Sequence, residues 1–261
     1  MSLLLALDVG NTNVVMGLFD PSQGPRSPLL ASWRMATSRE RTSDEYGLTS
    51  LGMLAQRGIG AQDVGHVVIS SVVPPLNPVL ERWLRVYFHA EPFWIGHHIT
   101  TGLKILLDNP EELGADRIVN AVAGIELFGV PLVAVDFGTA TTFDVVSAGC
   151  EYLGGIITPG IGISSEALFQ RASRLPRVEI TEPARLVGKN TVQAMQSGLY
   201  FGYVGLVDGI LARLLEAHPG SQVIATGGLA RVISPGSRYI QHVARDLTLE
   251  GLRILWQMNR K

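Results

Sequence analysis

Two short segments of the chain combine an aspartate with a glycine turn and with amide or hydroxyl side chains. The first reads LALDVGNTNVVMG, and the second reads VAVDFGTATTFDVV about half the chain later. Glycine lets a backbone turn tightly and bring successive N–H groups toward an anion. A carboxylate beside a phosphate is repelled unless a cation lies between them. Such turns therefore predict a site for phosphates together with metal ions.

The aspartates of the two segments, Asp8 and Asp136, are the candidate metal ligands. Magnesium suits a nucleotide site of this kind because it takes one or two carboxylates with phosphate oxygens and keeps several waters. A single D-x-G between two strands is usually an ordinary hairpin turn, but two matching copies favour a duplicated functional loop. The candidate phosphate-binding residues are Gly10, Asn11, Thr12, Gly138, Thr139, Thr141 and Thr142.

The segment LGADR suggests a second kind of chemistry. Gly114 is expected to begin a helix, which places Asp116 and Arg117 in a first turn where free backbone N–H groups favour an anion. Phosphoryl transfer uses a carboxylate that accepts the proton of the acceptor hydroxyl, and Asp116 suits that role. Arg117 can bind a substrate carboxylate bidentately. A favourable first-turn acid beside a surface charge explains the same pair, so the residues alone leave both interpretations open.

Apolar strands must flank both turns to position them. Residues 3–7 and 13–19 predict paired strands, and the segment from residue 131 repeats the strand–turn–strand pattern. This duplication predicts two similar domains that face each other, with a ligand in the cleft between them. Further elements are expected as a strand at 29–35, a strand at 66–73, a polar loop at 96–113, and helices at 43–58, 74–88, 114–127 and 191–217.

Composition and missing motifs exclude several classes of protein. The 261 residues are 46% hydrophobic and carry a formal charge of -2, which provides no field for collecting nucleic acid or anionic membrane. Cys150 is the single cysteine, so no disulfide framework is possible and a reducing compartment is indicated. The motifs of P-loop, dinucleotide-binding, zinc protease and serine hydrolase sites are missing. With no signal peptide and no uninterrupted apolar run of about 18 residues, we expect a cytoplasmic protein without a membrane span.

The helix expected at 191–217 contains four glycines at three- and four-residue steps: Gly198, Gly202, Gly205 and Gly209. Each costs up to about 1 kcal/mol relative to alanine in a helix. Several together predict close backbone packing against another element. From the residues alone, packing within the chain and packing against a second copy explain them equally well.

Taken in order, DVGNTN, GADR, VDFGTATTFD, GGIITPGI, VGKNT and the glycine turn VIATGGLA resemble the type III pantothenate kinases. That family belongs to the superfamily of acetate kinase, sugar kinases, Hsp70 and actin. The resemblance extends from residue 6 to about residue 228. It implies an α/β chain with two duplicated ribonuclease H-like domains and a central cleft, the actin-like ATPase fold, divided at 1–116 and 117–261. It also implies ATP-dependent phosphorylation of pantothenate to 4'-phosphopantothenate, the first step of coenzyme A biosynthesis.

The resemblance assigns roles to individual residues. It implies Asp116 as the catalytic base, Asp8 beside Mg2+, and Asp136 as the ligand of a monovalent cation, K+ or NH4+. Leu107 stands where many family members have a tyrosine, so it supplies apolar contact but no hydroxyl. The implied ATP-binding residues are Asp8, Gly10, Asn11, Thr12, Gly138, Thr139, Thr141 and Gly227. The implied pantothenate contacts are Leu107, Gly114, Asp116, Arg117 and Thr191, the last of them reaching across from the partner of a homodimer whose substrate site lies at the subunit interface.

Two other functions are weighed against a kinase. A nucleotide-binding accessory or regulatory protein without catalysis would keep the same fold, and members of this family have been labelled as accessory factors for transcription. The retained Asp116, Arg117 and both turns argue against it. An ATPase switch like actin or Hsp70 is disfavoured by the short chain and by the GADR helix, which water as the acceptor would not need.

Overall fold

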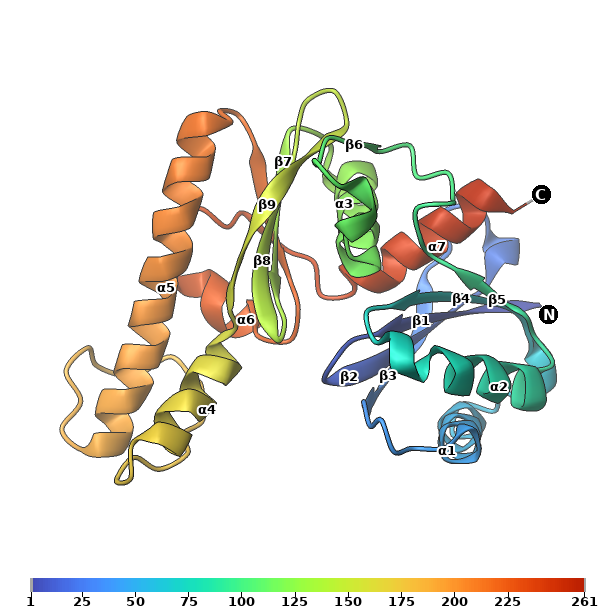
Figure 1. The fold of residues 1–261 in the computed structure, drawn as a ribbon, viewed down its shortest axis with the longest axis horizontal. Coiled ribbons are helices and arrows are strands. Elements are labelled where there is room, and N and C mark those ends of the chain that lie inside the picture. Colours follow the sequence, from blue (N-terminus) through green and yellow to red (C-terminus); the bar gives the residue numbers. More distant parts are fainter. Residues whose placement is uncertain (1, 261) are drawn as a thin grey trace. The chain divides into compact units, whose positions relative to one another are not determined.

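The computed structural model describes residues 2–260, and the chain divides into two compact units. Unit 1 comprises the residues up to 102, then 109–123, and those from 247 onward, and unit 2 comprises 103–108 and 124–246. Each unit contains a β-sheet covered by helices (Figure 1). The sheet of unit 1 has the strand order β3-β2-β1-β4-β5, and that of unit 2 has the order β11-β10-β7-β8-β9-β6.

In unit 1, the central strand β1 (Leu3–Val9) pairs antiparallel with β2 (Asn13–Phe19) and parallel with β4 (Val64–Ser71). Alternate residues of β1 point to opposite faces. One set enters a core built with α1 and α2, and Trp83 of α2 is fully buried there. The remaining elements of the unit are β3 (Leu29–Ala36), α1 (Ser43–Ala55), α2 (Asn77–Phe88), β5 (Pro92–Trp94) and α7 (Leu247–Asn259).

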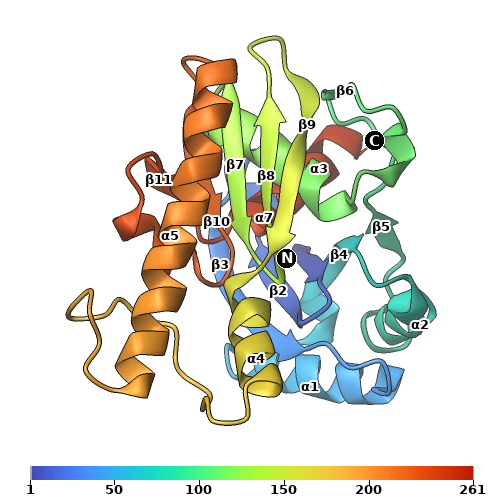
Figure 2. The same ribbon diagram turned by 60° about the vertical axis from the view of Figure 1, so that its left-hand side comes forward.

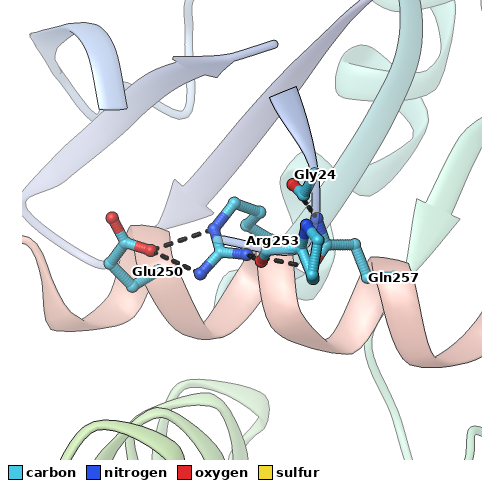
Figure 3. Close-up of polar contacts among 5 residues, drawn as sticks. Gly24, Glu250, Arg253 and Gln257 are labelled. Atoms are coloured by element: carbon cyan, nitrogen blue, oxygen red, sulfur yellow. Dashed lines mark hydrogen bonds and ion pairs between the residues drawn. The ribbon is translucent and has the colours of Figure 1, made fainter. Parts of the chain in front are cut away.

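Helix α7 covers the other face of this sheet. Gly17 of β2 leaves room for Leu249, because a Cβ on Gly17 would lie 2.8 Å from Leu249 Cδ1. The buried Arg253 of α7 forms an ion pair with Glu250 at 2.8 Å and donates to the carbonyl oxygen of Pro25 (Figure 3). The hairpin loop between β2 and β3 is therefore fixed to the last helix of the chain.

In unit 2, β7 (Leu132–Phe137), β8 (Ala140–Val146) and β9 (Glu151–Pro159) form an antiparallel meander, and β10 (Gln222–Thr226) pairs parallel with β7. Figure 2 shows the long helix α5 running beside this sheet. The short elements β6 (Lys104–Ile105), α4 (Ile161–Arg171), α6 (Ala230–Ile233) and β11 (His242–Val243) complete the unit. Short 3-10 helices occupy Pro21–Gln23, Ala61–Asp63, Pro74–Leu76, Pro110–Glu112 and Ser234–Gly236.

Helix α5 (Thr191–Ala217) buries one side, including Tyr203, Val207 and Leu211, against the sheet of unit 2. Its glycines at 198, 202 and 205 lie elsewhere, because a Cβ at any of them would meet no atom of the described residues within 4 Å. Packing within the chain therefore does not explain these three glycines. By length and composition alone, with a mean hydropathy of 1.4 over its best window, α5 is long enough to cross a membrane. A helix that packs on a soluble core passes the same test, so this is weak evidence for a span.

The compact units differ in three places from the division at residue 116 expected from the sequence. Helix α3 (Ala115–Phe128) begins in unit 1 and ends in unit 2. Residues 103–108 join unit 2 because β6 pairs with β9. The last helix belongs to unit 1 because it packs on β1 and β4.

Candidate active site

The first predicted turn joins β1 to β2 in unit 1. The N–H of Gly10 donates to the carbonyl oxygen of Asn13 at 2.9 Å, which leaves Asn11 and Thr12 exposed at the tip. Thr37, which follows β3, supports the turn twice: its N–H donates to the Thr12 carbonyl at 2.9 Å and its hydroxyl to the Gly10 carbonyl at 2.7 Å. The turn thus presents its polar tip to solvent from a fixed backbone, as a phosphate site requires.

Asp8 lies on the sheet face that α7 covers. Leu7 and Val9 enter the core with α1 and α2 on one side, so Asp8 between them points to the other side. In the parallel register of β1 and β4, Asp8 lies opposite Ser70. Ser70 is 1% exposed, and its hydroxyl has no hydrogen-bond partner among residues 2–260. No sequence motif marks this serine, although its position near the carboxyl end of a parallel strand is typical of ligand-binding residues.

The start of α3 forms a third part of unit 1. Asp116 lies in the first turn, and its Oδ1 accepts from the N–H of Arg117 at 2.8 Å. A Cβ on Gly114 would lie 2.6 Å from that same oxygen, so only glycine leaves the carboxylate in this place. The same Cβ would lie 3.8 Å from Val72, whose N–H donates to the Val9 carbonyl at 3.0 Å. Gly114 is therefore packed beside the carboxyl ends of β1 and β4.

Helix α3 also packs on α7, on the side of the sheet that Asp8 faces. Gly251 of α7 approaches the backbone of Val119 so closely that a Cβ would collide with the Val119 carbonyl oxygen. The hydroxyl of Thr248 donates to Asn120 Oδ1 at 2.8 Å. Unit 1 therefore brings the first turn, Asp8 and the start of α3 together at one end of its sheet.

The second predicted turn joins β7 to β8 in unit 2 and is one residue shorter. Four residues separate the paired Val9 and Val14 in unit 1, whereas three separate the paired Phe137 and Thr141 in unit 2. The Gly138 N–H donates to the Ala140 carbonyl at 3.1 Å, and Gly138 and Thr139 are exposed.

The shorter turn changes which threonine faces the predicted site. Since side chains alternate along a strand, losing one residue exchanges the two faces of β8. Thr141 is only 1% exposed, and its hydroxyl bonds to Tyr203 of α5. Thr142 instead lies opposite Asp136 and shares its face, and its hydroxyl donates to Asp144 Oδ2 at 3.2 Å. This placement favours Thr141 as a support of the turn over direct contact with ATP, and puts Thr142 on the face of Asp136.

The third glycine turn lies against Asp136. Gly227 has φ +93°, a conformation that favours glycine, and it follows β10, where Thr226 pairs with Asp136. A Cβ on Gly227 would collide with Asp136 Oδ1 and lie 2.7 Å from the backbone of Phe137, while a Cβ on Gly138 would lie 3.6 Å from the same carboxylate oxygen. Unit 2 therefore brings Gly138 and Gly227 together around the Oδ1 atom of Asp136.

The last two predicted substrate residues also lie in unit 2. Leu107 follows β6 and contacts β9 near Gly154, where a Cβ would lie 3.6 Å from Leu107 Cδ2. Thr191 is the first residue of α5, is exposed, and lines a cavity of about 630 Å³ between α4 and α5. Asn190 caps the helix there by accepting from the Gln193 N–H at 2.9 Å.

Comparison with known proteins identifies the family. The family model described as type III pantothenate kinase matches residues 4–213. A type III pantothenate kinase of Pelobacter propionicus is 54% identical over 259 residues, which cover 99% of this chain and 100% of that one. A type III pantothenate kinase of Geobacter sulfurreducens is 53% identical over 260 residues, with the same coverage of both chains.

Solved structures support the predicted fold. A candidate N-acetylmannosamine kinase of Listeria monocytogenes aligns with a TM-score of 0.52 and 12% identity over 98% of this chain and 100% of that chain. A Campylobacter jejuni protein described as a candidate Baf family transcriptional activator aligns with a TM-score of 0.58 and 18% identity over 97% of both chains. At such identities the likeness shows the fold alone.

The α/β fold with two sheets that sugar kinases share, expected from the family resemblance, is thus confirmed. The sequence relatives carry the assignment further, because each is more than half identical and covers nearly the full length of this chain. The chain belongs to the type III pantothenate kinase family.

Proposed function

We infer that the protein transfers the terminal phosphoryl group of ATP to pantothenate and forms 4'-phosphopantothenate, the first step of coenzyme A biosynthesis. The observation that carries this inference is the full-length identity of 54% to a type III pantothenate kinase. The geometry of unit 1 supports it, since a phosphate-type turn and an aspartate at a helix start lie at one end of one sheet.

Asp116 is proposed as the base. Its carboxylate is fixed at the start of α3 by the Arg117 N–H and by the space that Gly114 leaves. A carboxylate held in this way can accept the proton of the acceptor hydroxyl as the new P–O bond forms. Arg117 is proposed to bind the carboxylate of pantothenate, for which the planar guanidinium is suited. Leu107 and Gly114 are proposed to complete the substrate contacts.

Asp8 is proposed to hold Mg2+, which neutralises the charge that the phosphates carry. Among residues 2–260, no group of three or more histidine, cysteine, aspartate or glutamate side chains is placed to hold a metal ion. The fit is therefore to a magnesium ion bound by one carboxylate, phosphate oxygens and waters. The Ser70 hydroxyl opposite Asp8, which has no hydrogen-bond partner within residues 2–260, offers a further polar atom for such a hydrated ion. Gly10, Asn11 and Thr12 are proposed to bind the phosphates beside it.

Asp136 is proposed to hold a monovalent cation, K+ or NH4+, in unit 2. A Cβ at residue 227 would occupy the space beside its Oδ1, and a Cβ at residue 138 would also lie near that oxygen. The glycines of these two turns therefore leave room for an ion around Asp136 Oδ1. Gly138, Thr139 and Gly227 are proposed to contact ATP, with Thr141 holding the turn and Thr142 facing the ligand.

A homodimer is part of the same proposal, with Thr191 reaching the substrate of the partner subunit. Support comes from α5, whose glycines at 198, 202 and 205 leave an open strip beside the exposed Phe201 and Leu206. Glycines whose added Cβ would meet no atom of the described part of the chain are expected where a second backbone approaches closely. A cytoplasmic location accords with these assignments.

The test is ADP release by the purified protein with ATP, Mg2+ and K+, with and without pantothenate, and again with Na+ in place of K+. We expect release only when pantothenate is present, and faster release with K+ than with Na+. Release that ignores pantothenate would identify an ATPase. Pantothenate-dependent release that is equal in both salts would keep the kinase but remove the role of Asp136. ATP binding without release in any condition would favour the accessory protein.

A further inference from the structure

The hydroxyl of Tyr203 joins the two ends of the β8–β9 hairpin beside the second turn. Tyr203 lies on α5, is 6% exposed, and bonds through its hydroxyl to Thr141 Oγ1. The same hydroxyl donates to the carbonyl oxygen of Pro159 at 3.2 Å. Thr141 opens β8 after the turn and Pro159 ends β9, so one side chain of the helix ties both strands.

The ring of Tyr203 reaches the other strand of the turn as well. Its centroid lies 6.4 Å from that of Phe137, the residue between Asp136 and Gly138. Both rings belong to the buried core that α5 forms with the sheet. Tyr203 therefore contacts both strands that flank the second turn, β7 through Phe137 and β8 through Thr141.

The hydrogen-bond partners fix where the two hydroxyl protons point. A carbonyl oxygen can only accept, so the single phenolic proton of Tyr203 is used on Pro159. In the contact between Thr141 and Tyr203 either hydroxyl can donate, and with the phenolic proton on Pro159 it is the Thr141 hydroxyl that donates. Its proton is committed to the helix and is not directed at a phosphate.

The backbone around this tie has little freedom. The Gly160 N–H donates to the Thr139 carbonyl at 3.1 Å, and a Cβ on Gly160 would lie 2.6 Å from the Gly138 carbonyl oxygen. The turn and the end of β9 are thus in contact through main-chain atoms. A displacement of Thr141, just after the turn, would therefore also displace Gly138 and Thr139 at its tip.

We propose that Tyr203 is a positioning residue, which holds the Gly138–Thr139 backbone in the place that receives ATP through Thr141 and Pro159. The inference rests on the proposed function in one respect, namely that this turn binds ATP. It assigns a role to a residue of α5 that touches no substrate. It also makes Thr141 the connection between Tyr203 and the second turn, in place of a direct contact with ATP.

Tyr200 provides a matched control three residues earlier on the same helix. It is 1% exposed and belongs to the same core, but its hydroxyl has no hydrogen-bond partner among the described residues. In accord with this, burial raises the pKa of Tyr200. Tyr200→Phe and Tyr203→Phe each remove one buried hydroxyl from one helix face, and only the second removes a bond to the turn.

Steady-state kinetics of the full-length protein test the proposal. We expect Tyr203→Phe, which removes the bonds to Thr141 and Pro159, to raise the KM for ATP about three- to tenfold, with the KM for pantothenate within about twofold of wild type. Tyr200→Phe should leave both constants unchanged. Thr141→Val should change the KM for ATP in the same direction as Tyr203→Phe, and the double variant should be no worse than Tyr203→Phe, since that change already removes the bond to Thr141 together with the bond to Pro159. Equal effects of the two tyrosine variants, or additive effects in the double variant, would overturn the proposal.

Native-state amide exchange gives a readout that does not need activity. We expect Tyr203→Phe, but not Tyr200→Phe, to speed exchange at Gly138 and Gly160, whose N–H groups close the turn. Faster exchange in Tyr203→Phe, together with a wild-type protein that shows no pantothenate-dependent ADP release, would refute the proposed function and keep the positioning role. Unchanged exchange in an active enzyme would refute the positioning role and keep the function.

Discussion

The two aspartate–glycine turns begin from the same sequence pattern and are supported in different ways. In unit 1 the residue after the third strand is Thr37, which uses its N–H and its hydroxyl to hold the turn. In unit 2 the equivalent position is Gly160, which uses only its N–H and leaves no room for a side chain. The hydroxyl support comes instead from Tyr203 on a helix.

The chemistry beside the two turns differs as well. Unit 1 sets its turn at the end of the sheet where α3 places Asp116, whereas unit 2 sets its turn against a third glycine turn at Gly227. The duplicated sequence pattern thus forms a similar turn in each unit, and the elements packed beside each turn determine the function that we expect of it. We expect changes beside the first turn to affect the chemical step, and changes beside the second to affect nucleotide and cation binding.

The largest effect is expected for Asp116→Asn. The amide oxygen can still accept from the Arg117 N–H, so the helix start should be kept while the base is lost. We expect kcat to fall by about 10²–10⁴-fold, the usual contribution of a positioned base, with little change in the KM for ATP. Glu111→Gln is the matched control, since it removes one exposed carboxylate from the preceding segment and should keep full activity. A near-normal kcat for Asp116→Asn would end the assignment of unit 1 as the chemical half.

Gly160→Ala tests most directly whether the packing of Gly160 against the Gly138–Thr139 turn keeps that turn in place. Gly160 has φ −65° and ψ 155°, which alanine adopts without strain, so any cost comes from the Cβ meeting the carbonyl oxygens of Gly138 and Thr139. We expect kcat/KM for ATP to fall by about 10²-fold, because a displacement of about 1 Å in a binding turn has effects of this size. The control is Gly162→Ala two residues later in α4, where a Cβ would have no atom of residues 2–260 within 4 Å and helix propensity improves by up to about 1 kcal/mol. Equal kinetics of the two variants would show that the turn tolerates movement.

Gly227→Ala, compared with a control glycine, distinguishes the cost of a strained backbone from the loss of space beside Asp136 Oδ1. Gly220→Ala is the control, since Gly220 also has a positive φ, +79°, but its Cβ would meet none of the described atoms within 4 Å. Both variants should lose about 1–3 kcal/mol of stability from the strained backbone. Only Gly227→Ala should in addition weaken activation by K+, about tenfold or less, measured as ADP release over a K+ titration. The same K+ dependence in both variants would remove the cation site from this oxygen.

Sequence patterns foretold the fold better than the details of the site. Alternating apolar residues and the repeat of Asp-x-Gly predicted both hairpins, because period-two burial and turn chemistry are local properties. The face on which Thr141 lies was not predictable, since it depends on a turn one residue shorter and an aligned repeat hides that difference. The place of Ser70 opposite Asp8, and of the last helix on β1, depend on long-range pairing that no local pattern encodes.

The smallest effect is expected for Thr37→Val, which tests the first support in the way that Tyr203→Phe tests the second. Valine keeps the shape and the N–H bond to Thr12 but loses the hydroxyl bond to the Gly10 carbonyl. One such bond is worth about 1 kcal/mol, so we expect a three- to fivefold change in kcat/KM and a small fall in Tm. Thr49→Val in α1 loses a similar hydroxyl bond, to the Glu45 carbonyl at 2.6 Å, far from the turn in sequence, and should change only stability. If Thr37→Val raises the KM for ATP, as Tyr203→Phe is expected to do, and leaves kcat unchanged, then the two turns share the binding of ATP, and the division between a chemical and a binding half lies in α3 alone.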